Sequence, residues 1–382
     1  MSKTELYLSI IVKYGLYAIL LTPFIFWPRA LYAFATPKFI LFQVLVEIVF
    51  FAWLIIKVID SRNQSLLRRN YIVLALAAFL AVSFISALFG VDFSRSFWGI
   101  GARMTGLFTE LHFFAWFLVL VSTGNSNLRI HSNSTNDEKN DIRSIRMPFV
   151  DLNHYINFSF FVALVVAATA FYQNSHWALA TGSTVFNNPT FVAPYLIFHF
   201  FWGLYQLFKK RWFFGSGVAF LAFVILLIRI RGAILGLLAS LLFLGLGLIF
   251  INILSRRFKI MLFAFYFLTF LSLIGLWFAR ESFFVKNISI LSPLTHISLT
   301  ETTAQTRILA WQTALRGFSD RPILGAGPEN FNYLFNAHYN PKFLKFGGGG
   351  FGETWFDKPH NAFLEILTET GIIGGMAYLF IW

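Results

Sequence analysis

The chain has 382 residues, of which 57% are hydrophobic and only 12% are charged, and it contains no cysteine. A soluble domain carries about twice that charged fraction, so the composition excludes an ordinary soluble protein and indicates apolar surface that lies in a bilayer. The absence of cysteine excludes disulfides and thiolate metal sites. The net charge of +13 does not require a nucleic-acid partner, because Lys and Arg collect in the cytoplasmic loops of membrane proteins.

Apolar runs long enough to cross a bilayer as helices, which takes about 17–25 residues, recur along the chain. We place them at 8–27, 38–59, 71–89, 105–122, 153–172, 189–208, 213–230, 232–254, 260–279 and 361–382. Residues 213–254 are also open to interpretation as one broken hydrophobic block, because only a few residues around Arg229 divide them. The pattern predicts an all-α, polytopic membrane bundle of about ten spans.

The distribution of Lys and Arg predicts a cytoplasmic N-terminus. Most basic residues of the short loops then lie inside, at Lys57, Arg62, Arg68, Arg69, Arg129, Lys139, Arg143, Arg146, Lys209, Lys210, Arg211, Arg256, Arg257 and Lys259. Fewer lie outside, at Arg29, Lys38, Arg95, Arg103, Arg229 and Arg231. Because this bias follows the positive-inside rule in one orientation only, residues 280–360 are expected on the outer face of the membrane.

These features predict a transmembrane bundle at 1–279, a large outer loop at 280–360 and a last span at 361–382. The bundle includes a polar linker at 123–150 that is rich in Ser and Asn and is expected in the cytoplasm. The sequence stops inside its last apolar run, so we expect the last span to be truncated and the chain to be a fragment.

The large loop is expected to contain a helix at Thr302–Asp320. Four apolar residues recur there at spacings of three and four and form one stripe, namely Ile308, Trp311, Leu315 and Phe318. Arg321-Pro322 ends the helix, since the residue before a proline avoids helical backbone angles. A tight turn at 324–328, a second short helix at 329–337 and a run of four glycines at 347–350 follow.

Several motifs in and after this loop resemble the bacterial O-antigen ligase and O-antigen polymerase superfamily. They are Arg307-x-x-x-Trp311-x-x-Ala314-Leu315, then Pro322-Ile323-Leu324-Gly325-Ala326-Gly327-Pro328-Glu329-Asn330-Phe331, then His360-Asn361 followed after nine residues by Gly371-x-x-Gly374. The last of these fits the ligase pattern in full.

Motifs upstream of the loop extend the resemblance to residues 90–382. They are Ser96-Phe97-Trp98-Gly99, Arg103-x-x-Gly106, Phe186-Asn187-Asn188-Pro189 and Arg231-Gly232-Ala233. The chain departs from the family at Ile230, where members carry Ser before the Arg. Each motif alone is a weak signal, whereas their shared order and spacing are fairly specific.

The resemblance implies a glycosyltransferase C-like bundle in the bacterial inner membrane, with its active site on the outer face. Such enzymes take a glycan from an undecaprenyl-diphosphate carrier, in lipopolysaccharide and other polysaccharide biosynthesis for the cell envelope. The implied acceptor is lipid A core, another glycan or a protein. The resemblance implies neither a metal nor another cofactor, and no nucleic-acid partner.

This chemistry needs a cation for the diphosphate. Arginine suits this role, because its planar fork binds phosphate oxygens bidentately and stays charged. The candidates are Arg231, Arg307 and Arg103. As alternatives, Arg231, Arg229 and Arg103 are interfacial anchors that extend to the headgroups, and Arg307 is a solvated surface charge.

The chemistry also needs a group that accepts the proton of a sugar hydroxyl. His360 is the candidate, because it titrates near neutral pH and directly precedes the last span. It could instead donate a hydrogen bond to the diphosphate. Asn361 could orient His360 or cap the last helix, and Glu365 could pair with an Arg or be a buried structural acid. Asn187 and Asn188 are candidates for sugar contacts, although a turn and helix start is the simpler interpretation.

Three functions remain open at this stage. The His-Asn motif favours a ligase, which adds a preassembled glycan to an acceptor. A polymerase of the same superfamily would join one lipid-linked unit to another. A transporter, of the kind labelled bicarbonate-type among relatives, is the third, although the inverted repeats typical of transporters are not visible.

Overall fold

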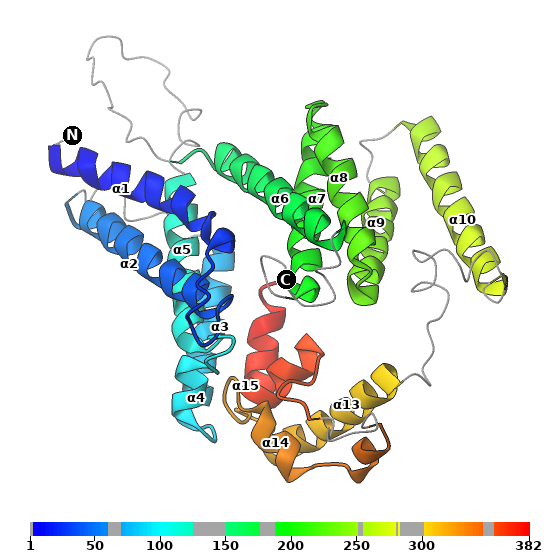
Figure 1. Ribbon diagram of the computed structural model, residues 1–382. Helices are drawn as coiled ribbons and strands as arrows, with labels where there is room; N and C mark the ends of the chain where they lie inside the picture. Colours follow the sequence, from blue (N-terminus) through cyan, green and yellow to red (C-terminus); the bar gives the residue numbers. More distant parts are fainter. Residues whose placement is uncertain are drawn as a thin grey trace. The chain divides into compact units, whose positions relative to one another are not determined.

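The computed structural model describes residues 3–59, 70–124, 150–175, 188–250, 255–279, 282, 302–346 and 355–382. Every regular element within these residues is a helix (Figure 1). The linker at 125–149, residue Asn187 and the glycines at 347–350 lie outside the described residues. The prediction of an all-α membrane protein is confirmed.

Eight of the described helices are long and apolar enough to cross a membrane. They are α2 (Thr36–Ile59), α3 (Tyr71–Leu88), α5 (Leu107–Gly124), α6 (Leu152–Ser175), α7 (Pro189–Phe208), α9 (Arg231–Phe250), α10 (Arg256–Phe278) and α15 (Ala362–Leu379). The other two predicted spans form shorter helices, α1 (Lys3–Ile19) of 17 residues and α8 (Phe214–Ile228) of 15 residues. The chain therefore has the predicted order of apolar helices, with two of them shorter than expected.

The described part of this apolar stretch, residues 213–250, forms two helices and not one block. Helix α8 ends at Arg229, whose φ of 58° is left-handed, and α9 begins at Arg231. A left-handed residue cannot continue an α-helix, so this position divides the apolar run.

Two compact units make up the chain and are described separately. The first comprises Met1–Tyr155 and Leu299–Trp382, and the second comprises Ile156–Ser298. In the first unit α1 packs on α2, α2 on α5, and α15 on α3. The division groups 299–382 with the N-terminal helices, which the sequence boundaries did not anticipate.

The second unit is held together by apolar packing between α6, α7, α8 and α9. Gly203 on α7 leaves room for Phe160 of α6 and Val218 of α8, because a side chain at this position would overlap both. Asn188 caps α7 by accepting from the amide of Thr190, and Pro189 is its first residue. Asn188 and Pro189 therefore form a helix start, the simpler of the two interpretations.

Within the first unit, residues 302–346 contain α13 (Thr302–Asp320), α14 (Phe331–Ala337) and the 3-10 helix η6 (Pro341–Phe346), coloured yellow to orange in Figure 1. The predicted helix at Thr302–Asp320 is confirmed, but its predicted apolar stripe is not the buried face: Trp311 and Leu315 are exposed. The buried face carries small residues, Ala310, Ala314 and Gly317 among them. The buried face carries small side chains because they let Leu334 of α14 approach the helix backbone at Gly317.

The sequence predicted one span at 361–382, but the helix in this span, α15, is broken. Its backbone leaves the helical region at Gly371, with φ 67° and ψ −168°, conformations that essentially only glycine adopts. The residues before α14 satisfy the freed backbone groups: Ala326 donates to Thr368 O at 2.9 Å, and Ile372 donates to Pro322 O at 2.8 Å. A Cβ on Gly371 would overlap the carbonyl of Ile323. The break is stable in an apolar segment because these groups are paired.

Candidate active site

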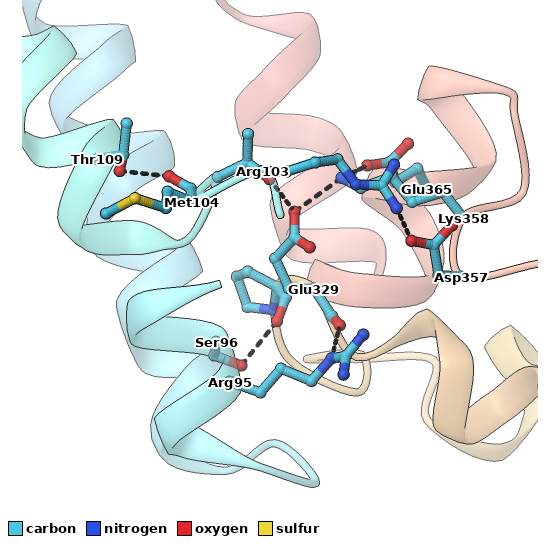
Figure 2. A network of polar contacts seen from close by, with 11 residues as sticks. Arg95, Ser96, Arg103, Met104, Thr109, Glu329, Asp357, Lys358 and Glu365 are labelled. Atoms are coloured by element: carbon cyan, nitrogen blue, oxygen red, sulfur yellow. Dashed lines mark hydrogen bonds and ion pairs between the residues drawn. The ribbon is translucent and has the colours of Figure 1, made fainter. Parts of the chain in front are cut away.

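The turn that precedes α14 is anchored on α4 (Phe93–Trp98), a short helix that follows α3. The amide of buried Asn330 donates toward the hydroxyl oxygen of Ser96 at 3.1 Å, and the Ser96 hydroxyl donates to Pro328 O at 2.8 Å. The Nε of Arg95 donates to Glu329 O at 2.7 Å. These bonds fix the backbone of Glu329, which has a left-handed φ of 62° (Figure 2).

Glu329 is buried and binds two other segments through one carboxylate oxygen. Its Oε1 accepts from the Thr105 hydroxyl at 2.7 Å and from the Lys358 ammonium at 2.8 Å. Burial by itself raises the pKa of Glu329, but Lys358, Thr105 and Arg103 outweigh it and hold the pKa below its ordinary value. Lys358 also donates to Glu365 Oε1 at 2.6 Å, so the ammonium lies between two carboxylates (Figure 2). Glu365 thus pairs with a lysine, where an arginine was considered from the sequence.

A closed loop between α4 and α5 presents Arg103. Gly99 and Gly106, at the two ends of this loop, are in close backbone contact, and a Cβ on Gly106 would overlap the backbone of Gly99. The amide of Arg103 donates to Ile100 O at 2.9 Å and so closes the turn. The guanidinium forms an ion pair with Asp357, and both side chains are partly exposed.

His360 lies on a turn whose neighbouring residues are all held. Asp357 pairs with Arg103, Lys358 pairs with Glu329 and Glu365, and Pro359 O accepts from the Trp311 indole at 3.0 Å. Asn361 caps α15 by accepting from the amides of Phe363 and Leu364, so its capping role, one of two considered, is the one observed. The turn therefore presents His360 on a rigid support.

The His360 ring is exposed and has no hydrogen-bond partner among the described residues. Its backbone is left-handed, with φ 53°, and its ring lies edge-on against Phe356 with centroids 5.1 Å apart. Partial burial lowers the pKa of His360, and the charges of Arg307, Arg103 and Lys358 lower it further, while Glu365 opposes them. The imidazole is therefore neutral at physiological pH, which is the form that accepts a proton.

Arg307 completes the group. It is exposed on α13, one turn before Trp311, and the bond from Trp311 to Pro359 brings this face of α13 to the His360 turn. Arg307 makes no ion pair or hydrogen bond within the described part of the chain, and its charge acts on His360. Its guanidinium is thus available to an anionic ligand beside a neutral imidazole.

Residues 216–379 match the family model described as O-antigen ligase. The match confirms the resemblance to the O-antigen ligase superfamily. It supports a multi-pass membrane enzyme that transfers glycosyl groups. No curated protein matches the chain, and no solved structure matches it.

The O-antigen ligase match covers Arg231, Arg307, Glu329, His360 and Glu365, whereas Arg103 lies before it. The structure brings Arg103, Arg307, His360, Asn361 and Glu365 together in the first unit. Arg231 begins α9 in the second unit, so its part in the site stays a prediction.

Lys358 and the side chain of Glu329 were missed in the sequence. Glu329 stands in a motif already noted, but nothing in a stretch of turn residues indicates that its carboxylate is buried. The signal for Lys358 is its place between Asp357 and Pro359 at the mouth of an apolar helix that carries Glu365 and Glu369. A lysine beside acidic residues at membrane depth is expected to pair with them.

Proposed function

We propose that the protein transfers a glycan from an undecaprenyl-diphosphate carrier to an acceptor sugar, as a ligase, on the outer face of the bacterial inner membrane. Lipid A core is the acceptor that the family resemblance favours, with another glycan or a protein as alternatives. The observation that carries the proposal is one arrangement: a neutral imidazole on a held turn, without a hydrogen-bond partner among the described residues, and subject to the charges of Arg103 and Arg307.

The two arginines suit the donor. A diphosphate carries two phosphoryl groups, and each guanidinium can bind phosphate oxygens through paired N–H donors. Arg307 pairs with no described residue and can do so directly, whereas Arg103 is held by Asp357 and would exchange that carboxylate for phosphate. Arg231 is a further donor-binding candidate from the second unit.

His360 suits the acceptor. In the proposed reaction the acceptor hydroxyl oxygen forms a bond to the anomeric carbon of the donor sugar, and the bond from that carbon to the diphosphate breaks. His360 takes the hydroxyl proton, and the diphosphate leaves with the electron pair. General bases of this kind contribute about 10²- to 10⁴-fold to rate.

The test is a transfer assay with the protein in nanodiscs. Undecaprenyl-diphosphate oligosaccharide is supplied with and without lipid A core, in the presence of a chelator. We expect one glycan on each core. A ladder of products without core would identify a polymerase, and no product beside an active reference ligase would reject glycan transfer and leave transport to be measured.

The pH dependence distinguishes a base from a hydrogen-bond donor at position 360. Because the pKa of His360 is lowered, a base stays active below its ordinary pKa of 6.5, and the rate falls only as the pH drops through the lowered value. An imidazolium that donates to diphosphate would lose rate as the pH rises through the same value. We therefore expect kcat to fall toward low pH as His360 becomes protonated. This falling part of the pH profile is called the acid limb below.

A further inference from the structure

We propose that Lys358 is a positioning residue for the transfer reaction: it fixes the His360 turn to three other segments and shields His360 from the charge of Glu365. This inference rests on the proposed function and deepens it. Neither the family match nor the sequence motifs assign a role to Lys358.

The first part of the inference concerns geometry. Lys358 Nζ lies 2.8 Å from Glu329 Oε1 and 2.6 Å from Glu365 Oε1, and the same oxygen of Glu329 accepts from Thr105 at 2.7 Å. One ammonium thus joins the His360 turn to the turn before α14, the loop that carries Arg103, and the first turn of α15 (Figure 2). Through Glu329 and Thr105, this connection adds to the Asp357–Arg103 ion pair in holding the loop of Arg103 against the His360 turn.

Burial makes the connection strong. The side chains of Lys358 and Glu329 are only 19% and 5% exposed. Removing one partner of such a buried pair leaves an uncompensated charge, which costs far more than the loss of a surface ion pair. Glu369 lies buried on α15, which also carries Glu365, and its Oε1 has no hydrogen-bond partner within the described residues. Burial lowers the pKa of Lys358, but Glu369, Glu365 and Glu329 outweigh it and raise the pKa, so Lys358 stays charged.

The second part concerns charge. His360 is influenced by Arg307 of α13, Arg103 of the α4–α5 loop, Glu365 of α15, and Lys358 on its own turn. Glu365 favours the imidazolium, and Lys358, which is bound to that carboxylate, opposes it. Without Lys358 the Glu365 carboxylate would act on His360 unscreened, so the pKa of His360 would be lowered less and the ring would take up a proton at a higher pH.

The variants that separate these two parts are Lys358→Met, Glu365→Gln, the double variant, and Lys358→Arg. Lys358→Met should lower the plateau of kcat by about 10²-fold, the cost of a displacement on the order of 1 Å at a reacting group. It should also move the acid limb to higher pH, and Glu365→Gln should move it to lower pH. In the double variant the acid limb of kcat should return toward the wild-type pH, while the plateau of kcat should stay low. Lys358→Arg keeps the charge, so its plateau and its acid limb should both lie between those of Lys358→Met and the wild type.

Lys342→Met is the matched control, because Lys342 is an exposed lysine of η6. It should leave the plateau and the acid limb unchanged. If Lys358 serves only folding, Lys358→Met will lower the yield of folded protein, while the folded fraction keeps the wild-type kcat and acid limb. That result would overturn the inference.

A measurement without substrate keeps the inference testable if the proposed function is wrong. Diethylpyrocarbonate modifies neutral imidazole, so the pH dependence of labelling at His360, located by mass spectrometry, reports the protonation of that ring. We expect the midpoint to rise in Lys358→Met and to fall in Glu365→Gln. Unchanged midpoints would reject the role of Lys358, whereas shifted midpoints in a protein without transfer activity would reject only the proposed reaction.

Discussion

The two units of the chain are held together in different ways. In the second unit, polar contacts join neighbouring helices: the Ser159 hydroxyl lies 2.8 Å from His199 Nε2, and Gln206 donates to Asn157 at 2.9 Å, both between α6 and α7. In the first unit, polar contacts join distant segments. Ser86 bonds to Leu324 O, 238 positions away, and Arg95 to Glu329 O, 234 positions away.

We expect the chemistry in the unit whose polar bonds hold distant segments together. Apolar packing between neighbouring helices is enough to associate spans in a membrane. In the first unit such bonds fix the turn before α14 to α3 and α4, and Glu329 of that turn pairs with Lys358, two residues before His360. The second unit contributes one candidate, Arg231, which allows the comparison to be tested.

The largest expected effect is at His360. We expect His360→Ala to lower kcat by about 10²- to 10⁴-fold, because it removes the proton acceptor. His338→Ala is the matched control, since His338 lies in the same unit, pairs with Asp320 at 2.5 Å and has no place in the proposed reaction. Equal losses in both variants, measured in the transfer assay, would refute the assignment of the base.

A smaller effect is expected at Arg307. Arg307→Ala should lower kcat/KM for the lipid-linked donor by about 10- to 100-fold, the worth of hydrogen bonds to a charged group. Arg307→Lys should recover part of the loss, because it keeps the charge and loses the fork. Arg316→Ala removes another exposed arginine of α13 and should have no effect. Similar losses for Arg307 and Arg316 would indicate general attraction of the donor.

Arg231 tests whether the second unit takes part in the reaction. We expect Arg231→Gln to lower kcat/KM for the donor by about tenfold, as for a single charged hydrogen bond. Arg229→Gln is the matched control, because it removes an arginine two residues earlier, at the end of α8. It should behave as wild type. An unchanged kcat/KM in Arg231→Gln would confine donor binding to the first unit.

The break in α15 predicts the smallest effect on rate and a clear effect on stability. Gly371→Ala should lower the free energy of unfolding by about 1–3 kcal/mol, because alanine is strained at this φ and ψ. Gly236→Ala in α9 is the control from the second unit, where a Cβ has open space, and should be neutral or slightly stabilising. The stability of both variants is measured as the midpoint of thermal unfolding in detergent, followed by tryptophan fluorescence. An unchanged midpoint for Gly371→Ala would show that the break is not required.

The sequence predicted helices best where the pattern was long. Apolar runs of about 20 residues can only be helices in a bilayer, so α2, α3 and α7 were located within a few residues. The pattern failed at α13, where the large residues Trp311 and Leu315 stay exposed and the buried face carries small ones. The periodic pattern reports only which side chains are hydrophobic. Close approach of two helices requires small side chains at the contact, which the pattern does not report.

The sequence by itself determined the membrane class and the order of the helices, and its motifs predicted the resemblance to the O-antigen ligase superfamily and the candidate role of His360. Composition and local pattern suffice for these, because each depends on residues near one another in the chain. Only the tertiary structure decided that α15 breaks at Gly371, that Asp357 occupies Arg103, and that Lys358 joins Glu329 to Glu365. Those features depend on burial and on contacts between distant segments, since a charge acquires its partner, and a freed backbone group its acceptor, only when the chain has folded.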